Sequence, residues 1–313
     1  MTWTELVFPA TQDEQPGLVA GVLAPLLADL DRPGLFLREL GPEGATRLLL
    51  QVRDAPPDLP TRTAALPVQP TAVRAATVAP LGGPVFDGPG LDETTRGFLA
   101  DTAPVAVDLS TRPDRTGAAL TLMTAHLAAV ADPARSGDGP PLSFLSFRSH
   151  AEAFLATTRD PNAARHAFDT RYTDHRTTVK AAVRAILLDG DPGDAAPWSA
   201  AARAAKPRFT AGFACADLVA HTGYTRDYLR ERTDFADNPF HSRAGASEQL
   251  QAYLGGDPSF LATRLLTSLL YVTLHSSGVS LMQRYFLCHA IAKACESIYH
   301  VDSMSLLADL AVG

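Results

Sequence analysis

The sequence has little lysine and little cysteine. Only 3 of its 27 basic residues are lysine, and the formal net charge is −7. Because nucleic-acid binding depends on concentrated positive charge, we expect no nucleic-acid partner. The cysteines form no CxxC pair and stand beside no cluster of histidines, so the sequence predicts no metal site and no disulfide framework. Their pattern favours a reducing compartment, the cytoplasm.

Long apolar runs and targeting signals are absent too. The longest apolar run, residues 265–274, is interrupted by Thr and Ser and is far shorter than the roughly 20 residues that a membrane span needs. The segment MTWTELVFPATQDEQPG carries acidic residues and prolines where a signal peptide has a basic start and an apolar stretch. We therefore expect a cytoplasmic protein with no membrane partner.

Familiar catalytic motifs are also missing. The chain has no GxSxG, HExxH, P-loop or GxGxxG arrangement. No period of 20 to 50 residues repeats, which excludes solenoids and propellers. An enzymatic role must therefore be argued from other features of the chain.

The first third of the chain contains a pattern of strands. After a helix predicted at 17–30, the segments GLFLREL (34–40) and TRLLLQVR (46–53) are typical of two strands joined by a GPEG turn. In the second strand apolar and polar residues alternate, except at Leu49, which predicts one buried face and one polar face. The polar face carries Arg47, Gln51 and Arg53. The other elements predicted here are a loop at 54–70, a strand near 71–78 and a helix at about 91–106.

From residue 117 onward helical periodicity dominates. The helices that it predicts lie at 118–131, 149–157, 161–188, 197–205, 211–229, 247–254, 258–275 and 280–300. The predicted fold class is therefore α+β, with a small antiparallel sheet from the N-terminal third and a mainly helical C-terminal two-thirds. We expect one elaborated domain over residues 1–313, rich in strands at 1–110 and in helices at 111–313.

The last two predicted helices meet at a short polar corner, SSGV (276–279). Gly278 can adopt a positive φ at the end of the first helix, and Ser280 can cap the second. The backbone requirements of the corner are thus met locally. These structural roles compete with any catalytic role of the same serines.

Three segments, in this order, resemble the C-terminal elimination domain of class I lanthipeptide dehydratases and its thiopeptide relatives. The FLREL and TRLLLQVR pair is similar to that family's Arg-bearing strands. PLGGPVFDGPGLDETTRGFLADTAPV is similar to its glycine-glycine stretch and the helix that follows, with Asp101-Thr102 where Asp-Ser is usual. LHSSGVSLMQRYFLCHAIAKACES resembles the terminal Leu-His, Arg and Glu pattern, which is fitted by Leu274, His275, Arg284 and Glu296.

Within this family the chain most resembles the stand-alone thiopeptide pyridine synthases, because it lacks the large glutamylation domain of full dehydratases. The family's Asn-Arg pair appears as Gln283-Arg284, and the inserted Ser-Ser-Gly-Val departs from the elimination enzymes. The resemblance implies a formal aza [4+2] cycloaddition between two dehydroalanines of a modified precursor peptide, followed by dehydration and loss of the leader peptide to form a pyridine. It implies no metal and no cofactor.

Such a reaction requires a folded substrate and hydrogen-bonding groups that move protons. On the second helix of the corner Ser280, Gln283 and Arg284 lie on neighbouring turns, so we expect them to converge, whereas Tyr285 points farther around. The catalytic candidates are His275, Ser276, Ser277, Ser280, Gln283 and Tyr285.

The peptide substrate also needs a binding surface away from the reacting atoms. Between Arg159 and Arg232 there are 12 basic and 9 acidic residues, and this basic stretch is our hypothesis for docking the leader peptide. The strand arginines are the alternative. The substrate-binding candidates are Arg284, then Arg165, Arg171 and Arg176 from the basic stretch, and Arg38, Arg47 and Arg53 from the strands.

Two other functions stay open. One is a partner-dependent eliminase, which removes glutamate from glutamylated Ser or Thr and would hold that carboxylate with the same strand arginines. The other is a non-catalytic subunit that binds the precursor peptide. The partners expected are an azole- and dehydroalanine-containing precursor peptide with its leader, and other biosynthetic enzymes.

Overall fold

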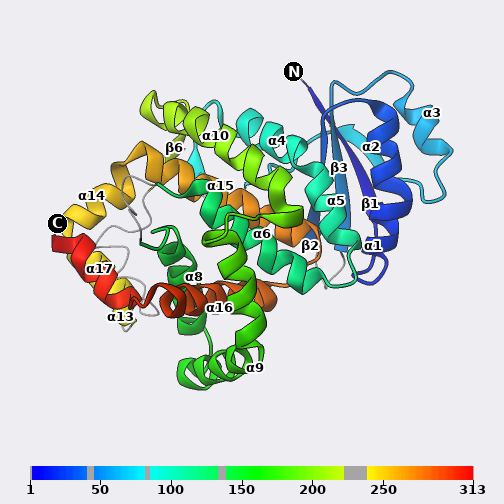
Figure 1. The fold of residues 1–313 in the computed structure, drawn as a ribbon. Coiled ribbons are helices and arrows are strands. Elements are labelled where there is room, and N and C mark those ends of the chain that lie inside the picture. Colours follow the sequence, from blue (N-terminus) through cyan, green and yellow to red (C-terminus); the bar gives the residue numbers. More distant parts are fainter. Residues whose placement is uncertain (1, 41–45, 82–84, 133–138, 222–237, 313) are drawn as a thin grey trace. The chain divides into compact units, whose positions relative to one another are not determined.

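The computed structural model describes residues 2–40, 46–81, 85–132, 139–221 and 238–312. The chain forms two compact units, each described by itself. The first unit comprises Met1–Gly83, Gly90–Ala119 and Ser268–Ser280, and the second comprises Pro84–Pro89, Leu120–Thr267 and Leu281–Gly313. The described chain is mostly helical with a small antiparallel sheet near its N-terminus, so the predicted α+β class is confirmed (Figure 1). The single domain stays a prediction.

A four-stranded antiparallel sheet, ordered β2-β3-β1-β4, belongs to the first unit. The strands β2 (Gly34–Leu40) and β3 (Thr46–Arg53) have the predicted bounds, whereas β4 is shorter than predicted, at Ala72–Ala75. The sequence pattern missed β1 (Trp3–Pro9), which lies between β3 and β4. The predicted GPEG turn lies outside the described residues.

One face of the sheet packs against the helices that follow β1. These are α1 (Gln15–Leu18), a π-helical turn at Val19–Leu23, and α2 (Ala24–Leu30) (Figure 1). Each fully buried Leu or Phe side chain contributes about 1.5–3 kcal/mol to stability. The Leu and Phe side chains of this core include Leu6, Phe8, Leu23, Phe36, Leu48 and Leu50.

The other face of β3 is buried at Leu49 and Gln51, which corrects the prediction of a polar face at these positions, whereas Arg47 on the same face is exposed. Gln51 is fully buried, and its Nε2 donates to Glu5 Oε2 on β1 at 2.9 Å. Arg74 of β4 donates to Glu5 Oε1 at 2.9 Å, and Arg96 of α4 (Leu91–Asp101) donates to Gln51 Oε1. Burial of both faces explains why Leu49 interrupts the alternation.

Two other predictions for the first unit are wrong. The segment predicted as a loop at 54–70 contains a short helix, α3 (Leu59–Ala64). The single helix predicted at about 91–106 is two helices, α4 and α5 (Ala103–Thr111), separated at Thr102. Pro104 in the first turn of α5 has no N–H to donate and so cannot continue the hydrogen bonds of α4.

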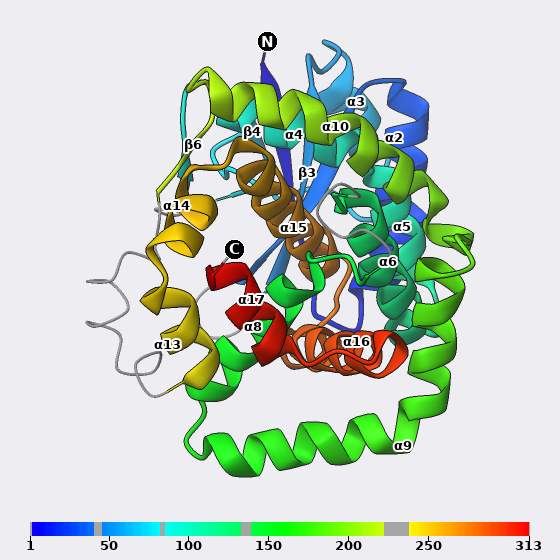
Figure 2. The same cartoon turned by 60° about the vertical axis from the view of Figure 1, so that its left-hand side comes forward.

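In the second unit, α16 (Leu281–Tyr299) packs on α8 (Phe144–Ala156) and on the long α9 (Pro161–Leu187) (Figure 2). Two helices run from one unit into the other. These are α6 (Arg115–Val130) and α15 (Pro258–Ser276). The remaining helical elements are a 3-10 turn at Gly193–Ala195, α10 (Ala196–Ala214), α13 (Pro239–Ala246), α14 (Glu248–Gly256) and α17 (Ser303–Val312).

The helix α10 corrects two predictions. It runs without interruption through Pro207, where we expected a break after residue 205. The buried side chains Trp198 and Phe209 lie on either side of this proline, and their packing offsets the missing backbone hydrogen bond. Where a helix was predicted at 211–229, α10 ends at Ala214 and β6 (Val219–Ala220) pairs with β5 (Phe86–Asp87). Residues 222–229 of that prediction lie outside the described residues. No helix in the described ranges is long and apolar enough to cross a membrane.

Candidate functional site

The corner after α15 is closed by its own backbone. The Gly278 N–H donates to the His275 carbonyl at 3.0 Å, and the Val279 N–H donates to the Leu274 carbonyl at 2.9 Å. This pair of bonds is a Schellman motif, and Gly278 has the positive φ of 83° that the motif requires. The buried side chains of Leu274 and Val279 complete it. The predicted role of Gly278 is confirmed.

The two serines of this corner differ in their hydrogen bonding, although both are buried. Ser277 Oγ donates to the Ala106 carbonyl at 3.0 Å, which ties the corner to α5 within the first unit. Ser276 is only 4% exposed, and its Oγ has no hydrogen-bond partner among the described residues. His275, in the last turn of α15, is half-buried. The Ser276 hydroxyl therefore has its proton free to donate, whereas the Ser277 hydroxyl already donates its proton to Ala106.

The other catalytic candidates flank the start of α16. Ser280 directly precedes the helix in the first unit, and Gln283 and Tyr285 lie in its first turns in the second unit. The Tyr285 ring stacks on Phe154 with centroids 4.5 Å apart, and the Arg284 guanidinium lies 4.7 Å from the Tyr285 centroid. The predicted convergence of Ser280 with Gln283 and Arg284 stays a prediction.

The strand arginines of the first unit have different surroundings. Arg47 faces Glu39 across the β2–β3 pair at 3.9 Å in an exposed position, and Arg53 pairs with Glu93 at 2.9 Å. Arg38 is half-buried, and its Nη2 donates to Gln12 Oε1 at 3.4 Å. Burial and the positive charge of Arg115 both lower the pKa of Arg38. Among the residues that the structure describes, Arg38 thus has no carboxylate partner, unlike Arg47 and Arg53.

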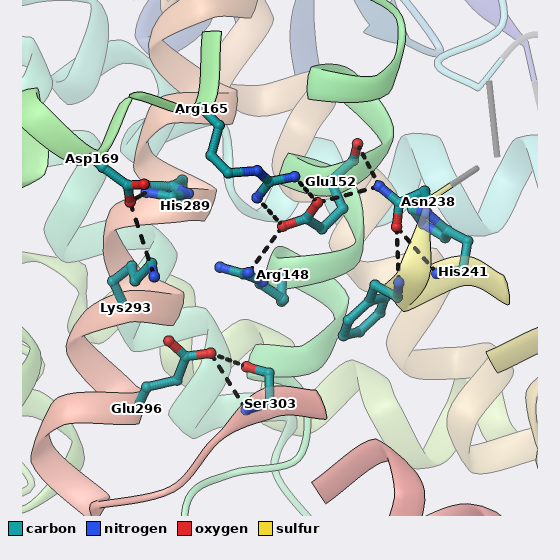
Figure 3. A network of polar contacts seen from close by, with 11 residues as sticks. Arg148, Glu152, Arg165, Asp169, Asn238, His241, His289, Lys293, Glu296 and Ser303 are labelled. Atoms are coloured by element: carbon teal, nitrogen blue, oxygen red, sulfur yellow. Dashed lines mark hydrogen bonds and ion pairs between the residues drawn. The ribbon is translucent and has the colours of Figure 1, made fainter. Parts of the chain in front are cut away.

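Arg165, predicted to dock the leader, belongs to a buried ionic network in the second unit (Figure 3). Its guanidinium binds Glu152 of α8 with two hydrogen bonds, the Nη1 bond measuring 2.6 Å. Arg148 adds a contact of 3.0 Å, and Asn238 Nδ2 donates to the same carboxylate at 3.2 Å. Burial raises the pKa of Glu152, but the Arg165 hydrogen bond and the two positive charges outweigh it and lower the pKa overall.

The other two arginines that were predicted to dock the leader, Arg171 and Arg176, lie farther along α9. The Arg171 guanidinium stands 4.1 Å from the centroid of the buried Phe286 ring, a cation–π contact within the second unit. Arg176 is exposed. Arg165 and Arg171 therefore serve packing inside the unit, and Arg176 is the one of the three that is open to a partner.

Two histidines of the second unit, the half-buried His150 and the buried His289, were not identified from the sequence. His150 of α8 stands near Arg284, and burial together with the charges of Arg284 and Arg264 lowers the pKa of His150 to about 4. Burial lowers the pKa of His289 to about 4 despite its 3.0 Å hydrogen bond to Asp169 (Figure 3). Both imidazoles are thus neutral at pH 7. Within the ranges that the structure covers, no three His, Cys, Asp or Glu side chains form a group that could hold a metal ion.

The family described as "Lantibiotic biosynthesis dehydratase C-term" matches residues 86–295, more than half of the chain. The chain belongs to this family. Two of the three segments that carried the resemblance, at 80–105 and 274–297, fall mostly inside the matched residues, and the strand pair at 34–53 precedes them. No curated protein matches the chain.

Two solved structures share the fold of this family member. One is described as "Crystal structure of TsrL", with a TM-score of 0.76, 21% identity and coverage of 98% of each chain. The other is described as "Pyridine synthase, TbtD, from thiomuracin biosynthesis", with a TM-score of 0.58, 20% identity and coverage of 96% of this chain and 99% of that one. Together with the family, these folds support an enzyme that matures a ribosomally made peptide.

The terminal family pattern also contains a residue whose contacts are structural. Glu296, near the end of α16, accepts hydrogen bonds from the hydroxyl and the N–H of Ser303, the first residue of α17 (Figure 3). The carboxylate therefore holds the start of α17, where it also complements the positive end of the helix dipole. Sequence reasoning missed α17, so this role of Glu296 had no visible signal.

Proposed function

We propose that this chain is a pyridine synthase acting on an azole- and dehydroalanine-containing precursor peptide. The azadiene is one dehydroalanine alkene conjugated with the imidic-acid form of its preceding backbone amide. Its two terminal carbons form two new C–C bonds to the alkene carbons of the other dehydroalanine. The hydroxyl then leaves as water and the leader peptide leaves as an amide, which makes the ring aromatic. The observation that carries the proposal is the family membership combined with a TbtD-like fold over nearly the whole chain.

Ser276 is the catalytic candidate that the local geometry favours. Its buried hydroxyl has no protein partner among the described residues, so it can bind the substrate amide or the departing hydroxyl. His275 in the same turn and Ser280, Gln283 and Tyr285 beyond the corner are proposed to share the proton transfers. Ser277, whose hydroxyl is engaged by Ala106, is proposed to position the corner.

The test is a single-turnover assay followed by mass spectrometry. Purified protein is incubated with a synthetic precursor that bears azoles and two dehydroalanines. A pyridine synthase yields two products, a macrocycle and a free leader fragment carrying a C-terminal amide. An unchanged substrate mass, with binding detected, contradicts the proposal and supports a non-catalytic peptide-binding subunit.

A second candidate is favoured by the family description, which names a dehydratase. In that case the chain eliminates glutamate from glutamylated Ser or Thr, in concert with a partner that adds it. The same assay separates the two with a second substrate, a peptide carrying glutamyl esters. Loss of glutamate from this peptide, with no macrocycle from the first, assigns elimination.

A further inference from the structure

Three aromatic rings of the second unit lie nearly parallel to one another. Phe168 of α9 and Phe154 of α8 have ring centroids 6.1 Å apart and planes inclined by 10°. The Phe154 ring also faces Tyr285 of α16, with centroids 4.5 Å apart and an inclination of 15°. Phe154 therefore joins the other two rings, and three helices contribute to the stack.

Tyr285 is half-buried, and its ring contacts two flat groups. Besides Phe154, the Arg284 guanidinium lies 4.7 Å from the ring centroid. Within the described ranges, the Tyr285 hydroxyl forms no hydrogen bond and is not among the fully buried polar atoms. The faces of the ring are thus engaged by the protein, while its polar tip is open to a ligand.

The Tyr285 hydroxyl keeps one position only if neighbours restrict its ring. The torsion that rotates a tyrosine ring has a broad energy profile, so the side chain alone does not fix it. Rotation of Tyr285 would drive its edge into the nearly parallel Phe154 ring, 4.5 Å away. Phe154 is restricted in turn by Phe168, which is buried and packs edge-to-face on Phe286 at 5.7 Å. A series of ring contacts thus connects the Tyr285 hydroxyl to the core of the second unit.

We propose that Phe154 is a positioning residue, which holds the Tyr285 hydroxyl against a backbone amide of the peptide substrate. A phenol hydroxyl can donate to the amide oxygen or accept from the amide N–H, so an amide suits it in either orientation. A displacement of about 1 Å in such a group can slow a reaction about 100-fold, so a ring beside it affects the substrate indirectly. The inference rests on the proposed function in taking a peptide as the substrate and Tyr285 as a residue that contacts it.

The experiment is a double-mutant cycle between Phe154 and Tyr285. Dissociation constants are measured by calorimetry for an unreactive precursor peptide, in which alanine replaces both dehydroalanines. The proteins are the unmodified chain, Phe154→Leu, Tyr285→Phe and the double variant, with Phe154→Tyr as the conservative replacement. The control is Phe260→Leu, because Phe260 is also half-buried and contacts a tyrosine of the same unit, Tyr253, with centroids 4.9 Å apart.

Tyr285→Phe is expected to weaken binding by about three- to tenfold, because one hydrogen bond to the peptide is lost. Phe154→Leu is expected to weaken binding by a similar factor in the unmodified chain, and by less than about twofold in the Tyr285→Phe background. Phe154→Tyr and Phe260→Leu should retain the affinity of the unmodified chain. Thermal melting checks that each variant folds.

A second measurement follows the stack itself in the unmodified chain. The protein is labelled with 3-fluorotyrosine, and the fluorine resonance that disappears in Tyr285→Phe is assigned to Tyr285. The ring current of Phe154 should displace this resonance upfield of that of an unstacked tyrosine, and Phe154→Tyr should retain the displacement. A Tyr285 resonance at the position of an unstacked tyrosine overturns the inference.

Equal losses of affinity from Phe154→Leu in both backgrounds also overturn it, since Phe154 would then act on the structure rather than through Tyr285. So does an affinity that Tyr285→Phe leaves unchanged, or an unmodified chain that does not bind the unreactive peptide. None of these outcomes depends on turnover. A chain that shows the cycle but makes no pyridine keeps the positioning role and refutes the proposed function, whereas a chain that makes pyridine without showing the cycle does the reverse.

Discussion

At the scale of single residues, Ser276 and Ser277 offer a matched pair, since they are adjacent, buried and chemically identical. Ser276→Ala removes a hydroxyl with no protein partner, so the melting temperature is expected to stay unchanged while pyridine formation slows by about 100-fold or more. Ser277→Ala removes one of the two hydroxyl donors to the Ala106 carbonyl, which keeps the bond from Ser110 Oγ at 2.7 Å, and is expected to cost about 1 kcal/mol of stability. Turnover assays and thermal melts check both. Full activity in Ser276→Ala would remove this serine from the chemistry.

A second prediction at this scale concerns the buried carboxylate of Glu152. Glu152→Gln leaves Arg148 and Arg165 without their counter-ion, and we expect a loss of about 3 kcal/mol in the free energy of unfolding at pH 7. Urea denaturation measures it. Asp108→Asn, which breaks the exposed pair with Arg112, is the control and should cost no more than about 1 kcal/mol.

The same pair of proteins gives a pH dependence with a defined sign. Because the pKa of Glu152 is lower in the folded chain than its ordinary value of 4.5, its contribution is complete above pH 4.5 and is lost as the pH falls through the folded value. The stability difference between the unmodified chain and Glu152→Gln should therefore shrink below pH 4.5. A difference that stays constant down to pH 3 would contradict the ionic role of this carboxylate. The buried histidines, which gain charge in acid, are present in both proteins and cancel.

Residue identities alone indicated where polar groups occur, but not which of them are paired. Arg165 and Glu152 are 13 positions apart, and Asn238 lies 86 positions from Glu152, so no local pattern joins them. Gln51 was placed on an exposed face because it alternates with leucines, yet a buried Glu5 on an unpredicted strand receives its hydrogen bond. Pairing of this kind is decided by tertiary contacts that periodicity does not encode.

At the scale of elements, the corner between α15 and α16 can be tested through Gly278. Gly278→Ala places a Cβ 3.0 Å from Arg115 Nη1 and puts alanine at a φ of 83°. Gly190→Ala is the matched control, because Gly190 has a φ of 74° and open space around its missing Cβ. In both variants the free energy of unfolding should fall by about 1 kcal/mol because of backbone strain. Pyridine formation should fall in Gly278→Ala alone, because the added Cβ meets Arg115 Nη1 and shifts the corner that carries Ser276.

Rates and melting temperatures of the two glycine variants decide this prediction. Equal rates in Gly278→Ala, Gly190→Ala and the unmodified chain would show that the position of this corner does not matter for turnover. The corner itself was predictable, since glycine and serine signals there are local. Elements whose formation depends on distant partners were not. The strand β1 forms because β3 and β4 supply its hydrogen bonds, and α10 continues through Pro207 because its buried face is packed.

At the scale of the whole molecule, the α+β class followed from the spacing of apolar residues along the chain. Their period changes from two residues in the strands to about 3.6 residues in the helices. The family followed from the order of three weak segments, of which the strand pair at 34–53 lies before the matched residues. Neither signal locates the surface that binds the leader peptide. That surface depends on which arginines of the basic stretch remain exposed after folding, and folding engages Arg165 and Arg171 inside the second unit.

Among the three named candidates of the basic stretch, the leader hypothesis therefore narrows to Arg176, which is exposed on α9. Arg176→Ala is expected to weaken binding of an acidic leader peptide several-fold without changing the melting temperature, because an exposed guanidinium contributes through screened charge. Calorimetry with the leader peptide alone measures this affinity at low and at physiological salt. The loss of affinity in Arg176→Ala should be larger at low salt. Arg32→Ala, exposed and outside the basic stretch, is the control. Equal leader affinity in Arg176→Ala and Arg32→Ala would exclude Arg176 as a docking residue and favour the strand arginines of the first unit for binding the leader.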